Sequence, residues 1–362
     1  MEKDSIEEHG FANVRRSFNW SSRLLKCMGI WPLKNYLPLF LFFFIYLFLH
    51  ISLTVANLIW SPKTMDIVIM SVAENMEQMM TLTKITIARI NRDELRKLFI
   101  ELKEYSLTEK YETKEQKLTF VNYTKLPPYF IVIIAFSMSM AELIYYLTRV
   151  AEGIQIGKQN NSMGYELPYK TIDIVDLSDG RIYGLLLIAQ FAILSYKVKT
   201  LLNNSKNYHE GMKNIVLRHY RLIRLSEKLE DIFNFPIMQL LLGSTIHICV
   251  SGYYLLMGPE MTDILTSLLF VFYMFSVTGT LFVYCFIGEC FIQESTKFGN
   301  AIYNYEWYNL PAMDAKFFLI CMIRTKKPQY LTSGKFAVLS LTVFTDIIKT
   351  SMGYLSVLRT FA

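Results

Sequence analysis

The chain has few of the residues that build catalytic or metal sites. Its 362 residues include only five histidines and five cysteines, which are scattered along the sequence and do not fall at the short spacings that hold a metal ion. The glycine loops that bind nucleotides and the signatures of serine and zinc hydrolases are also missing. We therefore expect that the protein is not an enzyme and uses no metal and no cofactor.

Charged residues are also scarce, at 19% of the chain, whereas hydrophobic residues make up 52% and the mean hydropathy is +0.28. Such a composition is too apolar for an ordinary soluble domain and indicates a polytopic membrane protein. The net charge of +6 reflects the orientation of the chain in the membrane, because cytoplasmic loops are rich in basic residues, so we expect no nucleic-acid partner.

Seven apolar runs are long enough to be spans of an all-α membrane bundle, each needing about 20 residues. They are Tyr36 to Trp60, Asp66 to Ala88, Pro127 to Val150, Ile182 to Tyr196, Pro236 to Met257, Leu265 to Ile287 and Phe336 to Leu358. The sequence therefore predicts seven transmembrane helices.

Basic residues orient these helices, since cytoplasmic loops are enriched in Lys and Arg. Of the 37 basic residues, 29 fall before the first run, between runs two and three, between runs four and five, or between runs six and seven. The opposite loops and tail hold only Lys63, Lys158, Lys170, Arg181 and Arg359. This distribution predicts a cytoplasmic N-terminus and an extracellular C-terminus, which is inverted relative to G-protein-coupled receptors.

The same pattern divides the chain into segments. We expect a cytoplasmic N-terminal segment (1–35), transmembrane helices one to six with the ligand-binding bundle (36–287), a cytoplasmic anchor segment (288–335), and a last helix with a short extracellular C-terminus (336–362). Within the bundle, residues 197–235 form a cytoplasmic helical extension. Its apolar residues from Tyr208 to Ile232 recur at three- and four-residue steps, which favours packing against partner helices up to Pro236.

The last predicted helix is the most polar of the seven. It carries Thr342, Thr345, Asp346, Lys349, Thr350, Ser351, Gly353 and Ser356. A helix that faces only lipid cannot satisfy so many polar groups, because hydrocarbon offers them no partner. We infer that this helix faces protein or a wet pathway. Several subunits around one axis could build a pore from such helices.

Three other predicted helices carry polar residues at depth. Glu74 and Glu77 are interleaved with methionines in the second, and Met138, Glu142 and Tyr145 share one face of the third. The sixth helix is rich in aromatic and hydroxyl side chains. These features suit either the wall of a pocket or interior packing, and the sequence leaves both open.

The C-terminal stretch contains a spaced set of motifs. The set comprises Tyr303 and Trp307 in AIYNYEW, the turn RTKKP at 324–328, Ser333-Gly334-Lys335-Phe336, Phe344, and Lys349-Thr350-Ser351 followed by Tyr354, Val357, Leu358 and Arg359. Near the other end, Trp31-Pro32 follows Gly29-Ile30. Together these resemble insect odorant receptors, and the N-terminal part resembles their ant, bee and wasp members.

This resemblance implies an odorant receptor that is an odorant-gated, non-selective cation channel subunit. It implies a tetramer with a shared co-receptor, opened by a volatile or semi-volatile molecule bound in the outer half of the helix bundle. The partners implied are an odorant, the co-receptor and membrane lipid. The location implied is the plasma membrane of the olfactory sensory neuron dendrite.

The resemblance also implies three groups of site residues. The expected ligand-binding residues are Met70, Ala73, Glu74, Met138, Glu142, Tyr145, Tyr183, Leu187, Tyr273 and Ser276. The expected pore and gate residues are Gly353, Ser356, Val357 and Thr360, with Val357 at a hydrophobic constriction. The expected anchor and oligomerisation residues are Tyr303, Trp307, Tyr308, Phe336 and Lys349.

Two other functions fit seven helices. The chain could be a chemoreceptor of the G-protein-coupled type with no pore of its own, although the inverted charge distribution argues against that reading. It could also be a subunit that binds odorant and contributes little to conduction.

Overall fold

The computed structural model describes residues 32–60, 65–108, 114–158, 180–201, 208–257, 264–305 and 307–361. Apart from one short hairpin, the regular structure of these residues is helical, so the predicted all-α class is confirmed. The helices are α2 (Leu37–Trp60), α3 (Met65–Ile90), α4 (Arg92–Thr108), α5 (Lys114–Lys158), α6 (Gly180–Leu201), α7 (Tyr208–Met257), α8 (Ile264–Tyr303), η3 (Trp307–Asn309), α9 (Ala312–Thr325) and α10 (Leu341–Phe361). The hairpin pairs β1 (Thr332–Ser333) with β2 (Ala337–Val338), which are antiparallel.

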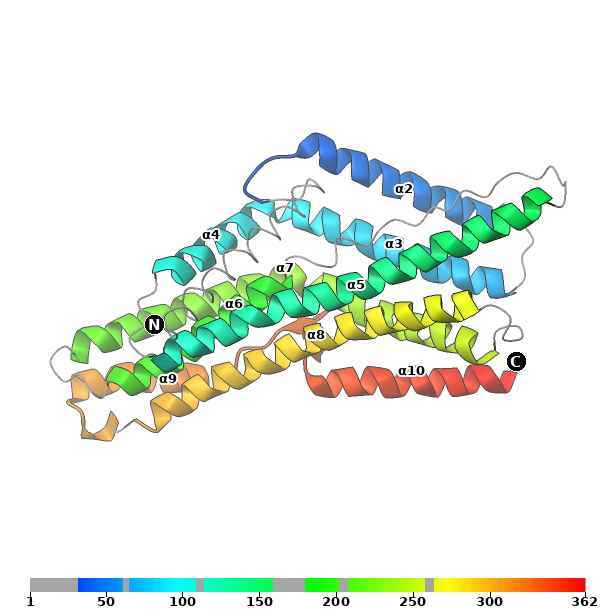
Figure 1. Ribbon diagram of the computed structural model, residues 1–362. Coiled ribbons are helices and arrows are strands. Elements are labelled where there is room, and N and C mark those ends of the chain that lie inside the picture. The colour runs from blue at the N-terminus through cyan, green and yellow to red at the C-terminus, as the bar shows by residue number, and fades with distance from the viewer. Residues whose placement is uncertain are drawn as a thin grey trace, which may run out of the picture.

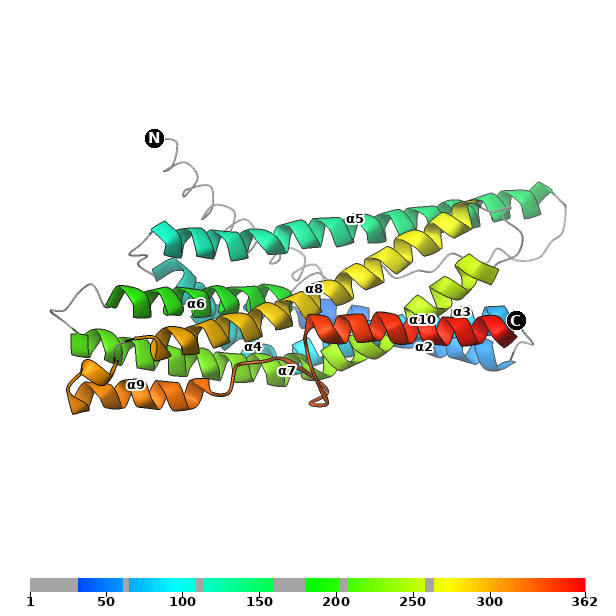
Figure 2. The same ribbon diagram turned by 90° about the horizontal axis from the view of Figure 1, so that it is seen from below.

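The helices form an elongated bundle in which α5, α7 and α8 run from one end toward the other (Figure 1). One end carries α4, α6 and α9, and the opposite end carries α2, α3 and α10. We call these the α9 end and the α10 end. The view from below shows α10 alongside the halves of α7 and α8 that lie away from α9 (Figure 2).

Among the described residues, three helices have the length and apolar composition needed to cross a membrane. They are α2, α7 over its stretch from His209 to Leu256, and α8 over a stretch that starts at Ser267. Shorter apolar stretches lie in α5, at Val132–Ala141, and in α6, at Tyr183–Val198. The predicted apolar runs therefore correspond to helices, several of which extend well beyond the run itself.

The helical extension of α7 packs as its spacing predicts. Met212, Ile215, Leu222, Leu225, Leu229 and Ile232 are all buried. Pro236 follows this seam without interrupting the helix, because α7 continues through Pro236 to Met257. A proline removes one backbone donor, and here α7 is held by α3, α6, α8 and α10 on its sides.

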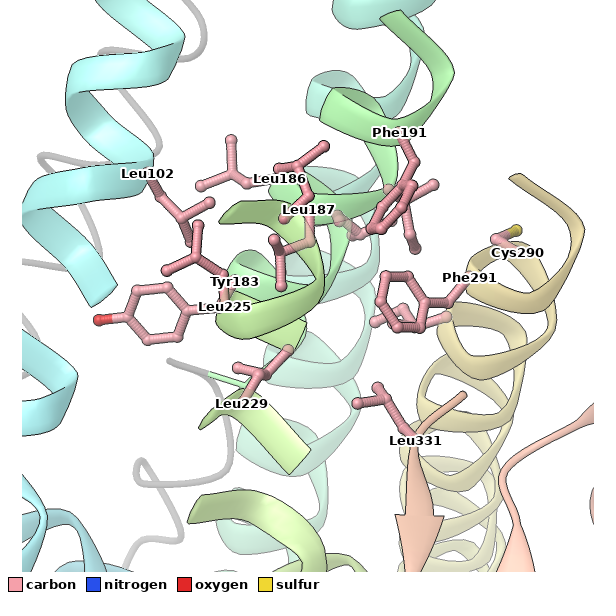
Figure 3. Packing of buried hydrophobic residues seen from close by; sticks show 14 of the residues in the cluster. Leu102, Tyr183, Leu186, Leu187, Phe191, Leu225, Leu229, Cys290, Phe291 and Leu331 are labelled. Carbon is pink, nitrogen blue, oxygen red and sulfur yellow. The ribbon is translucent and has the colours of Figure 1, made fainter. Parts of the chain in front are cut away.

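The main hydrophobic core fills the α9 end, where α6 is enclosed by α4, α5, α7 and α8. Phe191 of α6 packs edge-on against Phe291 of α8, with the ring centroids 5.6 Å apart. Figure 3 shows these two rings beside Leu225 and Leu229 of α7. Burying each such side chain contributes about 1.5–3 kcal/mol, so this core fixes how the long helices leave the α9 end.

Candidate pore helix and ligand cluster

A docked hairpin sets the start of α10. The apolar run predicts a helix from Phe336, but residues 332–338 form the β1–β2 hairpin and α10 begins at Leu341. Gly334 and Lys335 at its turn have φ of 60° and 61°, a region that ends regular helix. The hairpin is tied to α7: the Thr332 hydroxyl donates to Glu230 at 2.6 Å, and the Lys335 amide donates to Asn234 Oδ1 at 3.0 Å.

One face of α10 is docked on α7 and α8. Ser351 is fully buried there, its hydroxyl 3.5 Å from the Thr245 carbonyl and 2.8 Å from its own helix at Ile347. The Cys249 thiol in turn donates to the Ser351 carbonyl at 3.4 Å. Phe344 packs edge-on against Phe282 of α8, at 5.5 Å between centroids. These contacts therefore hold α10 alongside α7 and α8.

The opposite face of α10 is polar and exposed. At 100° per residue, its members fall on one side of the helix; they are Thr342, Thr345, Asp346, Lys349, Thr350, Gly353, Ser356, Val357 and Thr360, all exposed. Several hydroxyls bond back to their own helix, as Ser356 does to Gly353 at 2.7 Å and Thr360 to Val357 at 2.6 Å. The face thus combines small side chains, hydroxyls and one apolar residue near its end.

The four predicted pore and gate residues all lie on this exposed face. A Cβ added at Gly353 would meet nothing within 4 Å, and Val357 keeps 51% of its surface exposed. Within the single chain, neither residue is covered by another element. The geometry therefore allows water or neighbouring subunits to contact both.

The predicted anchor residues lie mostly on the surface. Tyr303 and Tyr308 are each 68% exposed, and Phe336 at the hairpin turn is 91% exposed. Trp307 is half-buried against the main core, whereas Lys349 belongs to the polar face of α10. Neighbouring apolar side chains of α9 are exposed as well, namely Met313, Leu319, Ile320 and Ile323. Exposed aromatic and aliphatic side chains of η3, α9 and the end of α8 are therefore numerous at the α9 end.

A polar cluster joins three helices in the α10 half of the bundle. The Tyr273 hydroxyl of α8 donates to Glu77 Oε2 of α3 at 2.6 Å and lies 3.2 Å from His247 Nδ1 of α7. The imidazole and phenol rings meet edge-on, 5.5 Å apart. A carboxylate, a phenol and an imidazole thus come together from segments far apart in the sequence.

Two hydroxyls next to this cluster differ from other helical hydroxyls of the bundle. Ser276 and Thr280, one turn apart on α8, are 0% and 1% exposed, and their oxygens have no hydrogen-bond partner. By contrast, Thr83, Thr86 and Ser226 donate to a carbonyl one turn earlier. A buried polar group without a partner is costly, which is typical of a site that meets a ligand or water.

Two predicted ligand residues, Tyr183 and Leu187, are not brought to this cluster. Figure 3 shows both in the core, near Leu102 of α4 and Leu225 of α7. Tyr183 contacts Phe99 and Phe233, with ring centroids 6.2 and 6.5 Å away. Gly184, next to Tyr183 on α6, lies against Ile287 of α8. Ile287 is about 21 Å along α8 from Tyr273, at 1.5 Å per residue.

The other predicted ligand residues divide into described and undescribed side chains. Met138 is half-buried and packs against the main core from α5. Met70, Ala73 and Glu74 belong to α3, and Glu142 and Tyr145 belong to α5. The side chains of these last five lie outside the described residues.

A separate polar cleft of about 520 Å³ lies at the α9 end between α5, α6 and α8. At its wall, the buried Glu294 accepts hydrogen bonds from the Tyr123 hydroxyl at 2.9 Å and the Lys297 ammonium at 2.6 Å. Burial, followed by the Glu294 charge, raises the pKa of Tyr123 well above its usual value, so the phenol remains a donor. Across the described chain, no cluster of His, Cys, Asp and Glu is suited to a metal ion.

Sequence reasoning missed His247 and did not place Glu77 or Thr280 among the ligand residues. The available signal was polarity within apolar segments: His247 interrupts an otherwise apolar stretch of α7, and such residues face the bundle interior. Their meeting with Tyr273 depends on the packing of three helices, which spacing along one helix does not reveal.

Comparison with known proteins agrees with this architecture. Residues 178–352 match the family described as 7tm Odorant receptor. Odorant receptor 13a of Drosophila melanogaster is 29% identical over 164 residues, 41% of this chain and 38% of that protein. Putative odorant receptor 92a of the same species is 26% identical over 186 residues, 49% of this chain and 45% of that protein. Each alignment therefore spans less than half of the relative's length.

A solved structure covers almost the whole fold. The insect olfactory receptor OR5 from Machilis hrabei, determined in complex with eugenol, superposes with a TM-score of 0.80 at 14% identity, over 97% of this chain and 100% of that one. A second structure of the same receptor superposes with a TM-score of 0.79. This chain therefore shares the seven-helix, all-α fold of that receptor.

Proposed function

Since the chain belongs to the insect odorant receptor family, we propose that it is a subunit of an odorant-gated, non-selective cation channel. In this proposal four subunits surround one axis and the α10 helices line the pore between them. The chain is a multi-pass membrane protein, which we place in the plasma membrane of olfactory sensory neuron dendrites, N-terminus inside.

The observation that carries the proposal is the division of α10 into two faces. Its apolar face and Ser351 are docked on α7 and α8, whereas its other hydroxyls, Asp346, Lys349 and Gly353 are exposed. A polar helix face in hydrocarbon is unfavourable, because backbone and side-chain groups would have no partner. A water-filled pathway formed by symmetry-related copies satisfies this face.

The exposed apolar side chains at the α9 end support assembly. Tyr303, Tyr308, Ile320 and Ile323 are exposed on a part of the protein that the charge distribution places in the cytoplasm. Contiguous exposed apolar surface in water marks a protein interface. We propose that this surface, together with Trp307 and Phe336, contacts neighbouring subunits, one or more of which are the shared co-receptor.

The ligand site in this proposal lies around Tyr273. The unpartnered hydroxyls of Ser276 and Thr280, together with Glu77 and His247, supply polar groups, and Met138 supplies an adaptable apolar contact. Met70, Ala73, Glu74, Glu142 and Tyr145 complete the proposed wall from α3 and α5. The receptor from Machilis hrabei was solved with eugenol, and we propose a small organic odorant for this chain.

Gating follows from linkage between this site and the pore. An odorant opens the channel only by the difference in its affinity for the open and closed states. Tyr273 belongs to α8, and α8 also carries Phe282 against Phe344 of α10. We propose that odorant binding shifts this contact and moves Val357 out of a hydrophobic constriction, where dewetting stops ions.

The test is whole-cell current in cells that express this chain with the co-receptor while an odorant panel is applied. Val357→Ala is compared with the parent chain, and Leu217→Ala, at an exposed position of α7, is the control. An odorant-evoked cation current whose amplitude or ion preference changes only in Val357→Ala supports the proposal. A robust current that is indifferent to Val357 would assign the chain a binding role without a share in the pore.

A further inference from the structure

The charged residues of α10 do not share one direction. The helix contains three of them, Asp346, Lys349 and Arg359. At 100° per residue, Asp346 lies about 20° around the helix from Val357. Lys349 lies about 80° from Val357, and Arg359 about 160° from it. Of the three charges, the carboxylate is therefore the one on the same side of the helix as the proposed gate residue.

Asp346 begins a narrow strip of the exposed face. Thr350, Gly353 and Val357 follow it at steps of three and four residues, and all four are exposed. They fall within about 60° of one another around the helix, and Val357 is about 17 Å from Asp346 along it, at 1.5 Å per residue. An α10 helix that turns Val357 toward a pore axis therefore turns Asp346 toward the same axis, nearer to the start of the helix.

The carboxylate of Asp346 is not used within the chain. Other carboxylates are neutralised by cations, as Glu294 is by Lys297 at 2.6 Å and Glu227 by Arg324 at 2.9 Å. Asp346, by contrast, forms no ion pair with any residue that the structure describes. An exposed carboxylate of this kind keeps its charge available to ions in the surrounding water.

Such a charge discriminates among ions in a water-filled pathway. Coulomb attraction at 4 Å in water enriches a monovalent cation about fivefold and a divalent cation about thirtyfold, before dissolved salt screens the field. Rings of Asp or Glu select cations in channels for this reason. Lys349 and Arg359 lie off the strip that contains Val357, so the strip itself carries a net negative charge.

We propose that Asp346 sets the cation preference of the pore, above all its permeability to divalent cations. This role rests on the pore proposed above, in which α10 helices surround one axis and Val357 forms the constriction. Each copy of this chain contributes one carboxylate to the pathway, at the end of α10 next to the β1–β2 hairpin.

The test measures reversal potentials of the odorant-evoked current in cells that express this chain with the co-receptor, with external sodium replaced by calcium. Asp346→Asn removes the charge and keeps the size of the side chain, and Lys349→Gln, beside the strip on the same helix, is the matched control. We expect Asp346→Asn to lower the calcium-to-sodium permeability ratio by about twofold or more, with a larger effect at low ionic strength, where screening is weaker. Lys349→Gln should leave the ratio unchanged.

A second variant separates the charge of the side chain from its place in the structure. Asp346→Cys is treated with a thiol reagent that carries a sulfonate, or with one of similar size that carries an ammonium group. We expect the sulfonate to restore the calcium permeability of the parent chain and the ammonium group to lower it below that of the unmodified thiol. The parent chain, which has five cysteines of its own, receives both reagents as the control.

The outcomes distinguish the role of Asp346 from the existence of the pore. An unchanged permeability ratio in Asp346→Asn, or equal effects of the two reagents on Asp346→Cys, would overturn the role of Asp346 while Val357→Ala still alters the current. Complete loss of current in Asp346→Asn at parent-like surface expression would also overturn it, because removing this charge should change which ions pass and not whether odorant opens the pore. Currents indifferent to Val357→Ala as well as to both changes at Asp346 would overturn the proposed pore itself.

Discussion

Gly288 of α8 lies against the backbone of Leu339, in the segment that leads into α10. A Cβ added at Gly288 would stand 2.8 Å from the Leu339 carbonyl carbon and closer still to its oxygen. The neighbour is backbone, so it cannot rotate away as a flexible side chain would. The entry to the proposed pore helix therefore depends on a residue without a side chain on α8.

Gly288→Ala should destabilise the protein by about 1–3 kcal/mol, as overpacking does, and shift the start of α10. Thermal unfolding of the purified chain measures the loss, and odorant-evoked current should fall with it. Gly353→Ala is the matched control for thermal unfolding alone, because nothing lies within 4 Å of that position in the chain, although it faces the proposed pore. An unchanged melting temperature in Gly288→Ala would mean that the close approach to Leu339 is absent.

Leu187→Ala should act on stability and not on odorant preference. Leu187 is 0% exposed within the α9-end core, and removing such a side chain costs about 2–5 kcal/mol. Thermal unfolding and surface expression should both fall, while the order of odorant potencies stays the same. Leu217→Ala, exposed on α7, should be neutral. A stable Leu187→Ala with altered odorant potencies would instead return this residue to the ligand site.

Tyr273→Phe should remove the hydrogen bonds of the polar cluster and keep its ring packing. The ring contact with His247 remains, but Glu77 loses its donor, and a hydrogen bond to a charged group contributes about 1.5–3 kcal/mol. We expect lower thermal stability without odorant and a shifted half-maximal odorant concentration. Tyr220→Phe, an exposed phenol on α7, should alter neither. Parent-like values for both quantities would show that the cluster takes no part in binding.

Tyr123→Phe should destabilise the α9 end by a similar amount, because the buried Glu294 loses a donor. The pKa of Tyr123 is raised above its ordinary 10.0, first by burial and then by Glu294. A raised pKa in the folded state means that the stability is fully present below about pH 10 and declines as the pH rises further. Unfolding measured from pH 7 to 11 should show a steeper loss of stability above pH 10 in the parent than in Tyr123→Phe.

The sequence predicted those features that depend on periodicity along one helix. The seam of α7, from Met212 to Ile232, is buried as its spacing indicates, and the polar residues of α10 share one face. Each of these follows from 3.6 residues per turn and the identity of the side chains. No knowledge of the neighbouring helices is needed for either.

Features that depend on neighbours were not predictable in the same way. The stretch around Leu187 is apolar on all sides. Such a sequence does not show whether lipid or protein covers the helix. The start of α10 moved to Leu341 because Gly334 and Lys335 turn the chain into a hairpin held by α7. The meeting of Tyr273 with Glu77 and His247 requires three helices at one depth.

The most direct test of the central claim is cysteine accessibility along α10. Ser356, Val357 and Thr360 on the exposed face and Ser351 and Ile347 on the docked face are changed singly to cysteine in the chain co-expressed with the co-receptor. A charged, water-soluble thiol reagent is applied during odorant-evoked current. We predict that the reagent reduces the current at the three exposed positions and leaves it unchanged at the two docked ones. Equal sensitivity of both faces, or none at either, would contradict a pore lined by this helix.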